Sequence, residues 1–505
     1  MQTETKILQR FTRLVLPFTF KSERIEKILR QTDSFRFNRS TARERAEGSA
    51  LWKAPGQVAS RQFFFPHIFE FLESTADDSY LFRREMTPEA LSLLFGLYGK
   101  DKRLQAALGK YCSEFEFTGF DLYLLKSGIG FLIAECSLVN PSPDAIIDFS
   151  YHIRYFSKYS AEISFCTSGF HEKKVKHYSD MSAEYKGNTE ASGMPEPFVR
   201  LHSYEVTEEG TLKCDQKVGL YDLFSELLAL VFTDKDRLML DVTGDNLLVF
   251  NYVFSSPFRE DAEREEFLYR AGHVFKESYV PHPGDLGNNC DHTLDTFRNI
   301  HFGITLEGAV ILVEDTGHAF FGQFAERVKN GYFMLYMLAL HNRLASIHFR
   351  IRITQIMPSE LGRIHRNRRF VKTVRHFRNE ILSFYLNAYF VQVTNNTNYE
   401  RVYRMYNQAF DVEVLLNEVK KKTDEIDDVL NRENERQSNS LMKKLTVLGA
   451  VFVPFSLILG LFGANFTSDV HPAGQFMFEW MHLIYSSAGL AVILFFVLLF
   501  YRIWR

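Results

Sequence analysis

The chain has 505 residues, of which 46% are hydrophobic and 24% are charged, and its formal net charge is −3. This composition excludes a disordered or repetitive chain, and so small a net charge does not indicate a class of partner. The five cysteines include no CxxC pair, which argues against a zinc site or a disulfide framework and favours reduced thiols in a cytosolic domain.

The first 324 residues are predicted to form an enlarged cytosolic α+β domain with a largely antiparallel sheet and helices. Charges interrupt the apolar residues of the N-terminus, so it does not read as a cleavable signal peptide. A helix is expected over 220–232, and the polar segment 171–197 is expected to be an exposed loop. Three hairpins are predicted where alternating runs flank short glycine turns, in 121–137, 237–254 and 302–314.

Residues 325–444 are predicted to form a helical region that ends in a stalk helix. Apolar residues recur at helical spacing in 325–348, in 363–393 and in 399–444. Neither proline nor glycine interrupts the last of these segments before Gly449. We therefore expect one long stalk helix that continues directly into the apolar segment after it.

Two apolar segments close the chain, over 445–462 and 481–501, and neither contains Asp, Glu, Lys or Arg. At 1.5 Å per residue, each is long enough as a helix to cross about 30 Å of hydrocarbon. They are predicted to be two transmembrane helices joined by a short extracytosolic loop, 463–480. The protein is accordingly expected to be a multi-pass protein of the cell inner membrane.

The charges that flank these segments predict their orientation. Lys443 and Lys444 precede the first segment, and Arg502 follows the second, so both termini are expected to face the cytosol. The connecting loop contains Asp469 and Glu479 but neither Lys nor Arg. Such an acidic loop would attract cations to a pore mouth.

One stripe of the first apolar helix mixes amide, hydroxyl, small and apolar side chains at spacings of three or four. Its members are Asn439, Met442, Leu445 with Thr446, Gly449, Val453, Ser456 and Gly460. Small residues let helices approach closely, polar ones can coordinate a passing ion, and rings of apolar side chains can gate a pore by dewetting. The alternative is a helix-packing face with ordinary polar spacers.

Residues 439–466 read NSLMKKLTVLGAVFVPFSLILGLFGANF. This segment resembles the signature of the CorA family of divalent-cation channels, in which a similar helix ends in Gly-Met-Asn. The resemblance covers about the last 180 residues and implies a homopentamer whose first membrane helices line one pore. A chain with two such helices cannot enclose a channel alone, which also favours an oligomer.

Carried over from the family, Asn465 would form the outer selectivity ring, with Gly463 shaping the turn beside it. The conduction path would be lined by Asn439, Met442, Leu445, Val453 and Ser456. Ala464 stands where the family has methionine, so the resemblance implies a cation pore but not selectivity for magnesium.

The enlarged N-terminal domain suggests a sensor with a different input, such as a bound ligand that regulates the pore. A basic cluster comprises Arg363, Arg366, Arg368, Arg369, Lys372, Arg375 and Arg378. It could bind ligand phosphates or be a solvated face. The stalk residues Asp424, Asp427 and Asp428 could hold a regulatory metal, as acidic intersubunit sites do in the family, or could also be solvated.

No P-loop, GxSxG or HExxH motif occurs, so an enzyme is not expected. The preferred hypothesis is a channel opened by a nucleotide second messenger, as is thought of CorA-like proteins beside type III CRISPR systems during phage infection. The alternative is a Mg²⁺- or Zn²⁺-type transporter gated by its own ion, and a third hypothesis is a non-conducting scaffold. The expected partners are further copies of the chain, the bilayer, divalent cations such as Mg²⁺ and an adenine-nucleotide-type ligand, without direct binding of nucleic acid.

Overall fold

The computed structural model places most of the N-terminal domain and the helices up to Gly463. It describes residues 5–34, 36–37, 49–56, 62–73, 79–88, 90–91, 102–108, 111–139, 141–155, 162–167, 204–206, 212–214, 218–229, 231–232, 246–276, 278–286, 292–356, 368–463, 484–485, 487–489, 491–492 and 495. The chain divides into two compact units, one of residues 1–359 with 377–421 and the other of residues 360–376 with 422–505.

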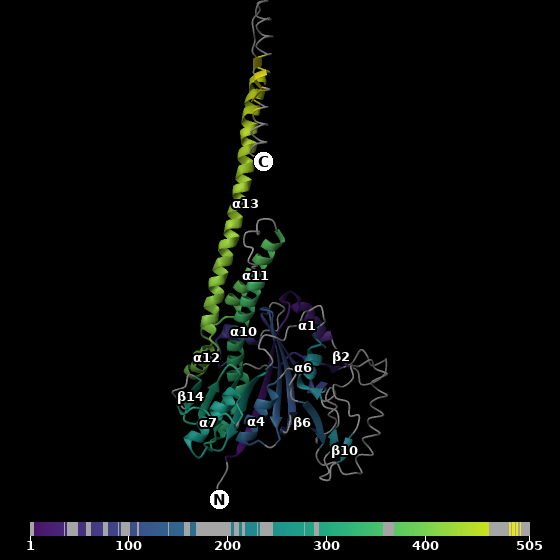
Figure 1. Ribbon diagram of the computed structural model, residues 1–505, viewed down its shortest axis with the longest axis vertical. Helices are drawn as coiled ribbons and strands as arrows, with labels where there is room; N and C mark the ends of the chain where they lie inside the picture. The colour runs from purple at the N-terminus through teal and green to yellow at the C-terminus, as the bar shows by residue number, and fades with distance from the viewer. Residues whose placement is uncertain are drawn as a thin grey trace, which may run out of the picture. The chain divides into compact units, whose positions relative to one another are not determined.

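The first unit is built on one large sheet (Figure 1), whose described strands run in the order β10-β11-β9-β6-β7-β8-β1-β13-β16-β15-β14. Strand β5 pairs with β7, β4 with β5 and β12 with β9, while β2 and β3 form a separate pair. Only β13 and β16 pair in parallel among the described strands. The prediction of a largely antiparallel sheet is therefore confirmed.

The strand bounds are β1 Ile7–Thr19, β2 Arg36–Phe37, β3 Ser49–Ala50, β4 Trp52–Lys53, β5 Leu81–Met86, β6 Lys102–Leu108, β7 Tyr111–Leu125, β8 Ile129–Leu138, β9 Glu162–Thr167, β10 Tyr204–Val206, β11 Leu212–Cys214, β12 Val218–Gly219, β13 Leu248–Ser255, β14 Thr293–Phe297, β15 Ile300–Ile304 and β16 Gly308–Glu314. The helix bounds are η1 Ser22–Arg24, α1 Ile25–Ser34, α2 Pro66–Glu73, α4 Pro143–Ile153, α6 Leu220–Ala229, α7 Asp261–His273, η3 Pro283–Asp285, α8 Ala319–Gly322, α9 Phe324–Arg327, η4 Val328–Tyr332, α10 Phe333–Ile356, α11 Arg368–Asn387, α12 Thr397–Ala409 and α13 Val412–Gly463.

Two of the three predicted hairpins are present. Strands β7 and β8 flank Gly128, whose positive φ of 81° suits a residue without a Cβ, and β15 pairs with β16 across the second turn. In the third, β13 matches the predicted second strand, but residues 237–242 lie outside the described residues, as does the predicted loop 171–197.

The central strand β1 lies between β8 and β13, and almost all of its side chains are buried. Because successive residues of a strand point to opposite faces, Leu14, Leu16 and Phe18 pack into the core shared with α4, α6 and α7. On the opposite face, the Arg13 guanidinium lies 4.3 Å from the ring centroid of Phe333 in α10. The sheet is therefore covered by helices on both faces.

A buried ion pair connects the second face of the sheet to the start of α10. The Arg13 guanidinium lies 2.8 Å from the Glu135 carboxylate, and the Lys329 ammonium donates to the other oxygen of that carboxylate at 2.6 Å. Burial alone would raise the pKa of Glu135, but these two cations outweigh it and lower the pKa. Glu135 is thus held ionised between the sheet and the helical layer.

The predicted helix over 325–348 is present but is interrupted by the π-helical turn η4. A Cβ on Gly331 in this turn would lie 2.9 Å from the Tyr399 ring, so only glycine permits that approach. The rings of Tyr332 and Tyr399 stack at 4.4 Å between centroids. The turn therefore joins the start of α10 to α12.

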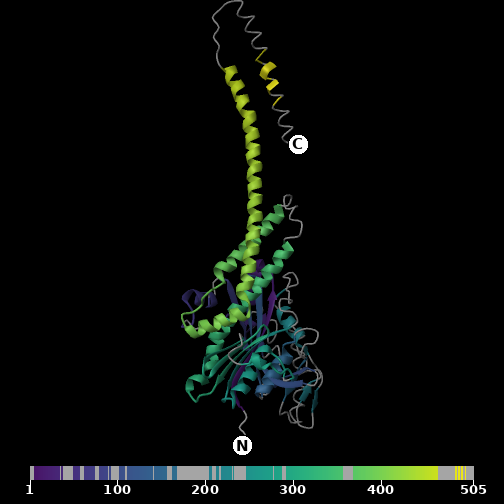
Figure 2. The same ribbon diagram turned by 60° about the vertical axis from the view of Figure 1, so that its left-hand side comes forward.

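The prediction of one stalk helix over 399–444 is wrong at its beginning. Helix α12 ends at Ala409, and α13 begins at Val412 after Asp411, whose φ of 51° is left-handed. The Arg343 guanidinium donates to the Phe410 carbonyl at 2.8 Å, which satisfies an acceptor freed by the break. From Val412 the helix runs unbroken to Gly463 (Figure 2), as the uninterrupted sequence predicts.

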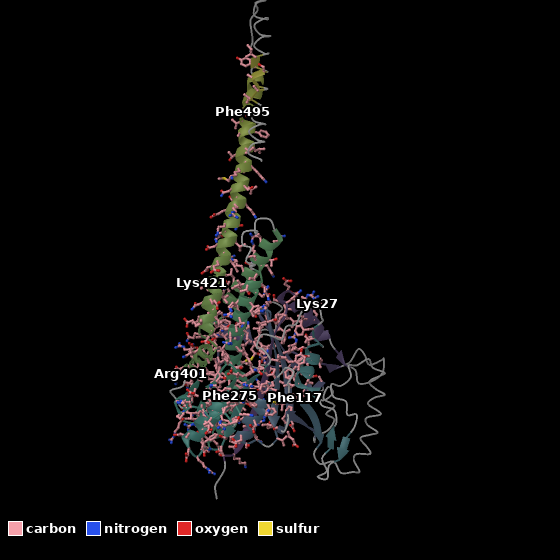
Figure 3. The ribbon with its side chains drawn as sticks, viewed as in Figure 1. Lys27, Phe117, Phe275, Arg401, Lys421 and Phe495 are labelled. Atoms are coloured by element: carbon pink, nitrogen blue, oxygen red, sulfur yellow. The ribbon has the colours of Figure 1, made fainter. Side chains whose placement is uncertain are left out.

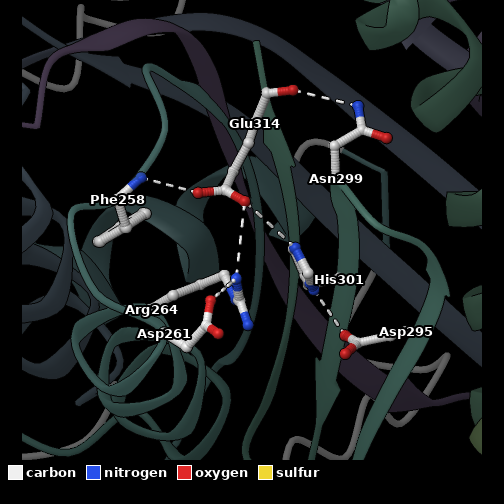
Figure 4. Close-up of polar contacts among 7 residues, drawn as sticks. All are labelled: Phe258, Asp261, Arg264, Asp295, Asn299, His301 and Glu314. Carbon is white, nitrogen blue, oxygen red and sulfur yellow. Dashed lines mark hydrogen bonds and ion pairs between the residues drawn. The ribbon is translucent and has the colours of Figure 1, made fainter. Parts of the chain in front are cut away.

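The far edge of the sheet is tied to α7 by a polar cluster (Figure 4). The buried His301 donates from Nδ1 to Asp295 at 2.6 Å, and its Nε2 lies 3.4 Å from the Glu314 carboxylate. Glu314 also accepts from the Phe258 amide at 2.7 Å and lies 3.8 Å from the Arg264 guanidinium. Burial alone would lower the pKa of His301, but its bonds to the two carboxylates raise it.

This cluster predicts a dependence of stability on pH. Because the pKa of His301 is raised in the folded protein, its stabilising contribution is complete below the unfolded pKa of about 6.5 and is lost as pH rises through the folded pKa. We expect His301→Gln to cost about 1–3 kcal/mol at pH 6 and less at pH 9. Thermal unfolding of the purified protein measures this difference, with the exposed His376→Gln as the control. A cost that is the same at both pH values would contradict the prediction.

Candidate functional site

The candidate pore face lies on the C-terminal half of α13. In the single chain, Met442, Leu445 and Val453 are 64%, 67% and 64% exposed, and Asn439, Gly449 and Ser456 are exposed beside them. The neighbouring Leu441, Leu448 and Phe452 are also more than half exposed. A helix with apolar side chains on every side requires lipid or protein around it.

Hydroxyl groups on this helix keep their oxygen atoms available as acceptors. Ser456 Oγ donates to the Val453 carbonyl at 2.9 Å, and Thr446 Oγ1 donates to the Met442 carbonyl at 2.8 Å. Each hydroxyl proton is therefore directed to the helix backbone, while the lone pairs of the oxygen remain free. An oxygen in this state suits the binding of a cation or of its hydration water.

The remaining predicted pore residues are described only in part. Helix α13 ends at Gly463, while Ala464, Asn465, Asp469 and Glu479 lie outside the described residues. In the second apolar segment, Ile484 and Tyr485 are more than half exposed, as is Phe495 (Figure 3). Within the described part of the chain, no helix has the length and the apolar character that a membrane span needs.

The acidic stalk residues lie on α13 without forming a metal site in the single chain. Asp424 and Asp428 are exposed and Asp427 is half-buried, at the spacing of one helix face. Among the described residues, no group of three His, Cys, Asp or Glu side chains converges as metal ligands would. A site shared between copies of the chain stays a prediction.

The basic cluster is placed in part by α11. Lys372 and Arg375 are exposed on this helix, and Arg378 is half-buried. The backbones of Arg368 and Arg369 belong to the start of α11, whereas Arg363 and Arg366 lie outside the described residues. Lys372 and Arg375 therefore face solvent, and a role of the basic cluster in binding phosphate stays a prediction.

Sequence reasoning missed a second group of cations, which we call the aromatic–cationic cluster and which consists of Tyr151, Arg154, Tyr155 and Lys276. The Arg154 guanidinium lies 5.4 Å from the Tyr151 ring centroid and 5.2 Å from that of Tyr155. The Lys276 ammonium lies 5.7 Å from the Tyr151 centroid. The sequence signal that could have indicated it is the closeness of Tyr151, Arg154 and Tyr155 in the chain, at the end of α4 and just after it.

The two tyrosines of this cluster interact directly. Their ring centroids are 5.5 Å apart, and the hydrogen bond that Tyr151 donates to Tyr155, together with burial, raises the pKa of Tyr151 to about 12. Burial would also raise the pKa of Tyr155, but this hydrogen bond and the charges of Arg154 and Lys276 lower it. The cluster is thus a place of positive potential.

Comparisons with known proteins bear on the C-terminal part of the chain. A search of curated proteins finds no match. Among solved structures, the chain is similar to "The complete structure of CorA magnesium transporter from Methanocaldococcus jannaschii", at 17% identity and a TM-score of 0.22, over 51% of this chain and 91% of that one. A TM-score this low does not bear on the fold.

The family model described as CorA-like Mg²⁺ transporter protein matches residues 312–502. The matched segment begins within β16 and includes α10 to α13 and both apolar segments. The signature expected from the sequence, over 439–466, lies inside it. Residues 312–502 are therefore similar to the CorA-like family, in agreement with the resemblance found in the sequence.

Proposed function

We propose that the chain assembles into a CorA-like cation channel, a homopentamer in which five copies of α13 line one pore. The observation that carries this proposal is the face of α13, where exposed apolar side chains alternate with Asn439, Gly449 and Ser456 on one unbroken helix. The CorA-like match over 312–502 supports the same function. Exposed apolar residues on every side of the helix require neighbours, and further copies surrounded by lipid would supply them.

In this proposal the protein is a multi-pass protein of the inner membrane with both termini in the cytosol. Residues 445–462 and 481–501 cross the bilayer, and the intervening loop carries Asp469 and Glu479 toward the pore mouth. Divalent cations are the proposed substrate, as the family description indicates for Mg²⁺. Ala464 replaces the family's methionine, so the preference among divalent ions is left open.

The ring of Asn465 side chains is proposed to bind the hydrated cation. Replacing Asn465 by alanine removes one amide oxygen per subunit, and since each neutral hydrogen bond is worth about 1 kcal/mol, we expect cation flux to fall by about tenfold or more. Uptake of Mg²⁺ into liposomes containing the purified protein measures this. Gln475→Ala removes an amide from the same loop and is the matched control. Equal, measurable flux through Asn465→Ala and the unmodified protein would contradict the role of the Asn465 ring, and no flux through either would favour a non-conducting scaffold.

Apolar rings on the pore face are proposed to close the channel by excluding water. A polar side chain at Leu445 would wet this constriction, so we expect Leu445→Asn to raise the flux of the resting channel by roughly tenfold or more. The same liposome assay, without added ligand, tests this. Val447→Asn introduces the same group two residues along the helix, on the side opposite the stripe, and should leave the resting flux low. A similar rise in both variants would show a general loss of packing.

The input to the channel is proposed to be a nucleotide second messenger that binds the cytosolic domain, with a role in type III CRISPR defence by analogy. The aromatic–cationic cluster supports an anionic input, because its cations lie on a partly exposed surface of this domain. The alternative input, the conducted ion itself, is supported by the exposed carboxylates of Asp424 and Asp428.

The two inputs predict opposite responses in one experiment. If a nucleotide opens the channel, an adenine nucleotide on the cytosolic side should increase flux at constant Mg²⁺. If the ion itself gates the channel, cytosolic Mg²⁺ should reduce flux, and substitution of Asp424 and Asp428 by asparagine should abolish that reduction. Flux that responds to neither addition would contradict both inputs and leave the channel itself standing.

A further inference from the structure

We infer that the aromatic–cationic cluster is a binding site for a small anion that carries a planar ring, which by chemical class is a nucleoside phosphate. This inference rests on the proposed nucleotide input and names the place where it would act. It differs from the earlier expectation, which assigned the phosphate contacts to the basic cluster 363–378.

In the part of the chain that the structure describes, no carboxylate pairs with the two cations of this cluster, Arg154 and Lys276. The Nε and Nη1 atoms of Arg154 are also buried without a hydrogen-bond partner. Buried guanidinium donors that lack an acceptor are costly, and an anion would satisfy them.

Neighbouring groups respond to the same positive charge. The pKa of Tyr155 is lowered despite its partial burial, and that of His152 is lowered by burial and by Lys276. Asp148 acts on His152 in the opposite direction but does not reverse the shift. The shift of Tyr155, and in smaller part that of His152, thus agrees with the positive charge of Arg154 and Lys276 at this place.

The aromatic rings would allow the site to recognise a second part of the ligand, its planar ring. Tyr151 and Tyr155 are half-buried, and Tyr279, which follows Lys276 along the chain, is 54% exposed. The ring of Tyr279 lies 5.5 Å from that of Phe275, which Figure 3 labels. Exposed tyrosine rings beside an arginine and a lysine suit a ligand that stacks its base and presents a phosphate to the cations.

Contacts from this site lead to the centre of the sheet. The Arg154 carbonyl accepts from the Leu247 amide at 2.7 Å, just before β13 begins. In the same helix as Tyr151, Ser150 Oγ accepts from the Asn251 amide at 3.0 Å, and Asn251 Oδ1 accepts from Thr12 at 2.7 Å. Ligand binding at the end of α4 would therefore act on β13 and β1, the strands at the centre of the sheet.

The test is direct binding to the full-length protein in detergent by titration calorimetry, with AMP, adenosine and inorganic phosphate as probes. We expect AMP to bind more tightly than adenosine or phosphate, because only AMP uses both the rings and the cations. Arg154→Gln and Tyr151→Leu should each weaken AMP binding by about tenfold or more. Lys276→Gln, which leaves α4 untouched, should do the same if Arg154→Gln impairs folding.

The matched control is Lys372→Gln, which removes an exposed cation from the basic cluster on α11 and should leave the affinity for AMP unchanged. The inference is overturned if the folded protein does not bind AMP, if phosphate binds as tightly as AMP, or if Lys372→Gln weakens binding and Arg154→Gln does not. Flux is measured on the same preparations. Binding without a change in flux would refute the nucleotide input and leave the site, whereas flux without binding would refute the site and leave the channel.

Discussion

The rest of the N-terminal domain depends on the burial of both faces of strand β1. Residues such as Leu14 and Leu16 exclude water on the side of α4, α6 and α7, while Arg13 faces α10. Since a charged group buried on its own would be costly, Arg13 needs Glu135, and Glu135 in turn holds Lys329 at the π-helical turn. One alternating strand thus organises an apolar layer on one side and an ionic connection to the helices on the other.

Much of this architecture could be predicted because its signals are local. The turn at Gly128 and the strands beside it are encoded within a few residues, and so is the helical spacing of 412–463. The break at Asp411 could not be predicted, because neither proline nor glycine marks it. It depends on Arg343, nearly 70 residues away, which bonds the carbonyl at the break.

The two candidate sites differ in the same respect, because local spacing predicts one of them and the other depends on contacts between distant segments. The pore face lies on a single helix, so its spacing alone predicts that Asn439, Met442 and Leu445 share one side. In the aromatic–cationic cluster, Lys276 lies beside the end of α4, although more than 100 residues separate the two in the chain. Sequence spacing can align Tyr151, Arg154 and Tyr155, but only the packing of α4 with α7 adds the second cation.

The left-handed residue at Asp411 has a mechanical consequence. Helix α13 has 52 residues and therefore extends about 78 Å from that joint without an internal break. A rigid helix of this length acts as a lever arm, so a tilt of about 3° at its base displaces its far end by about 4 Å, more than the diameter of a water molecule. A small change in the contact between Arg343 and the Phe410 carbonyl would therefore be magnified along the length of the helix.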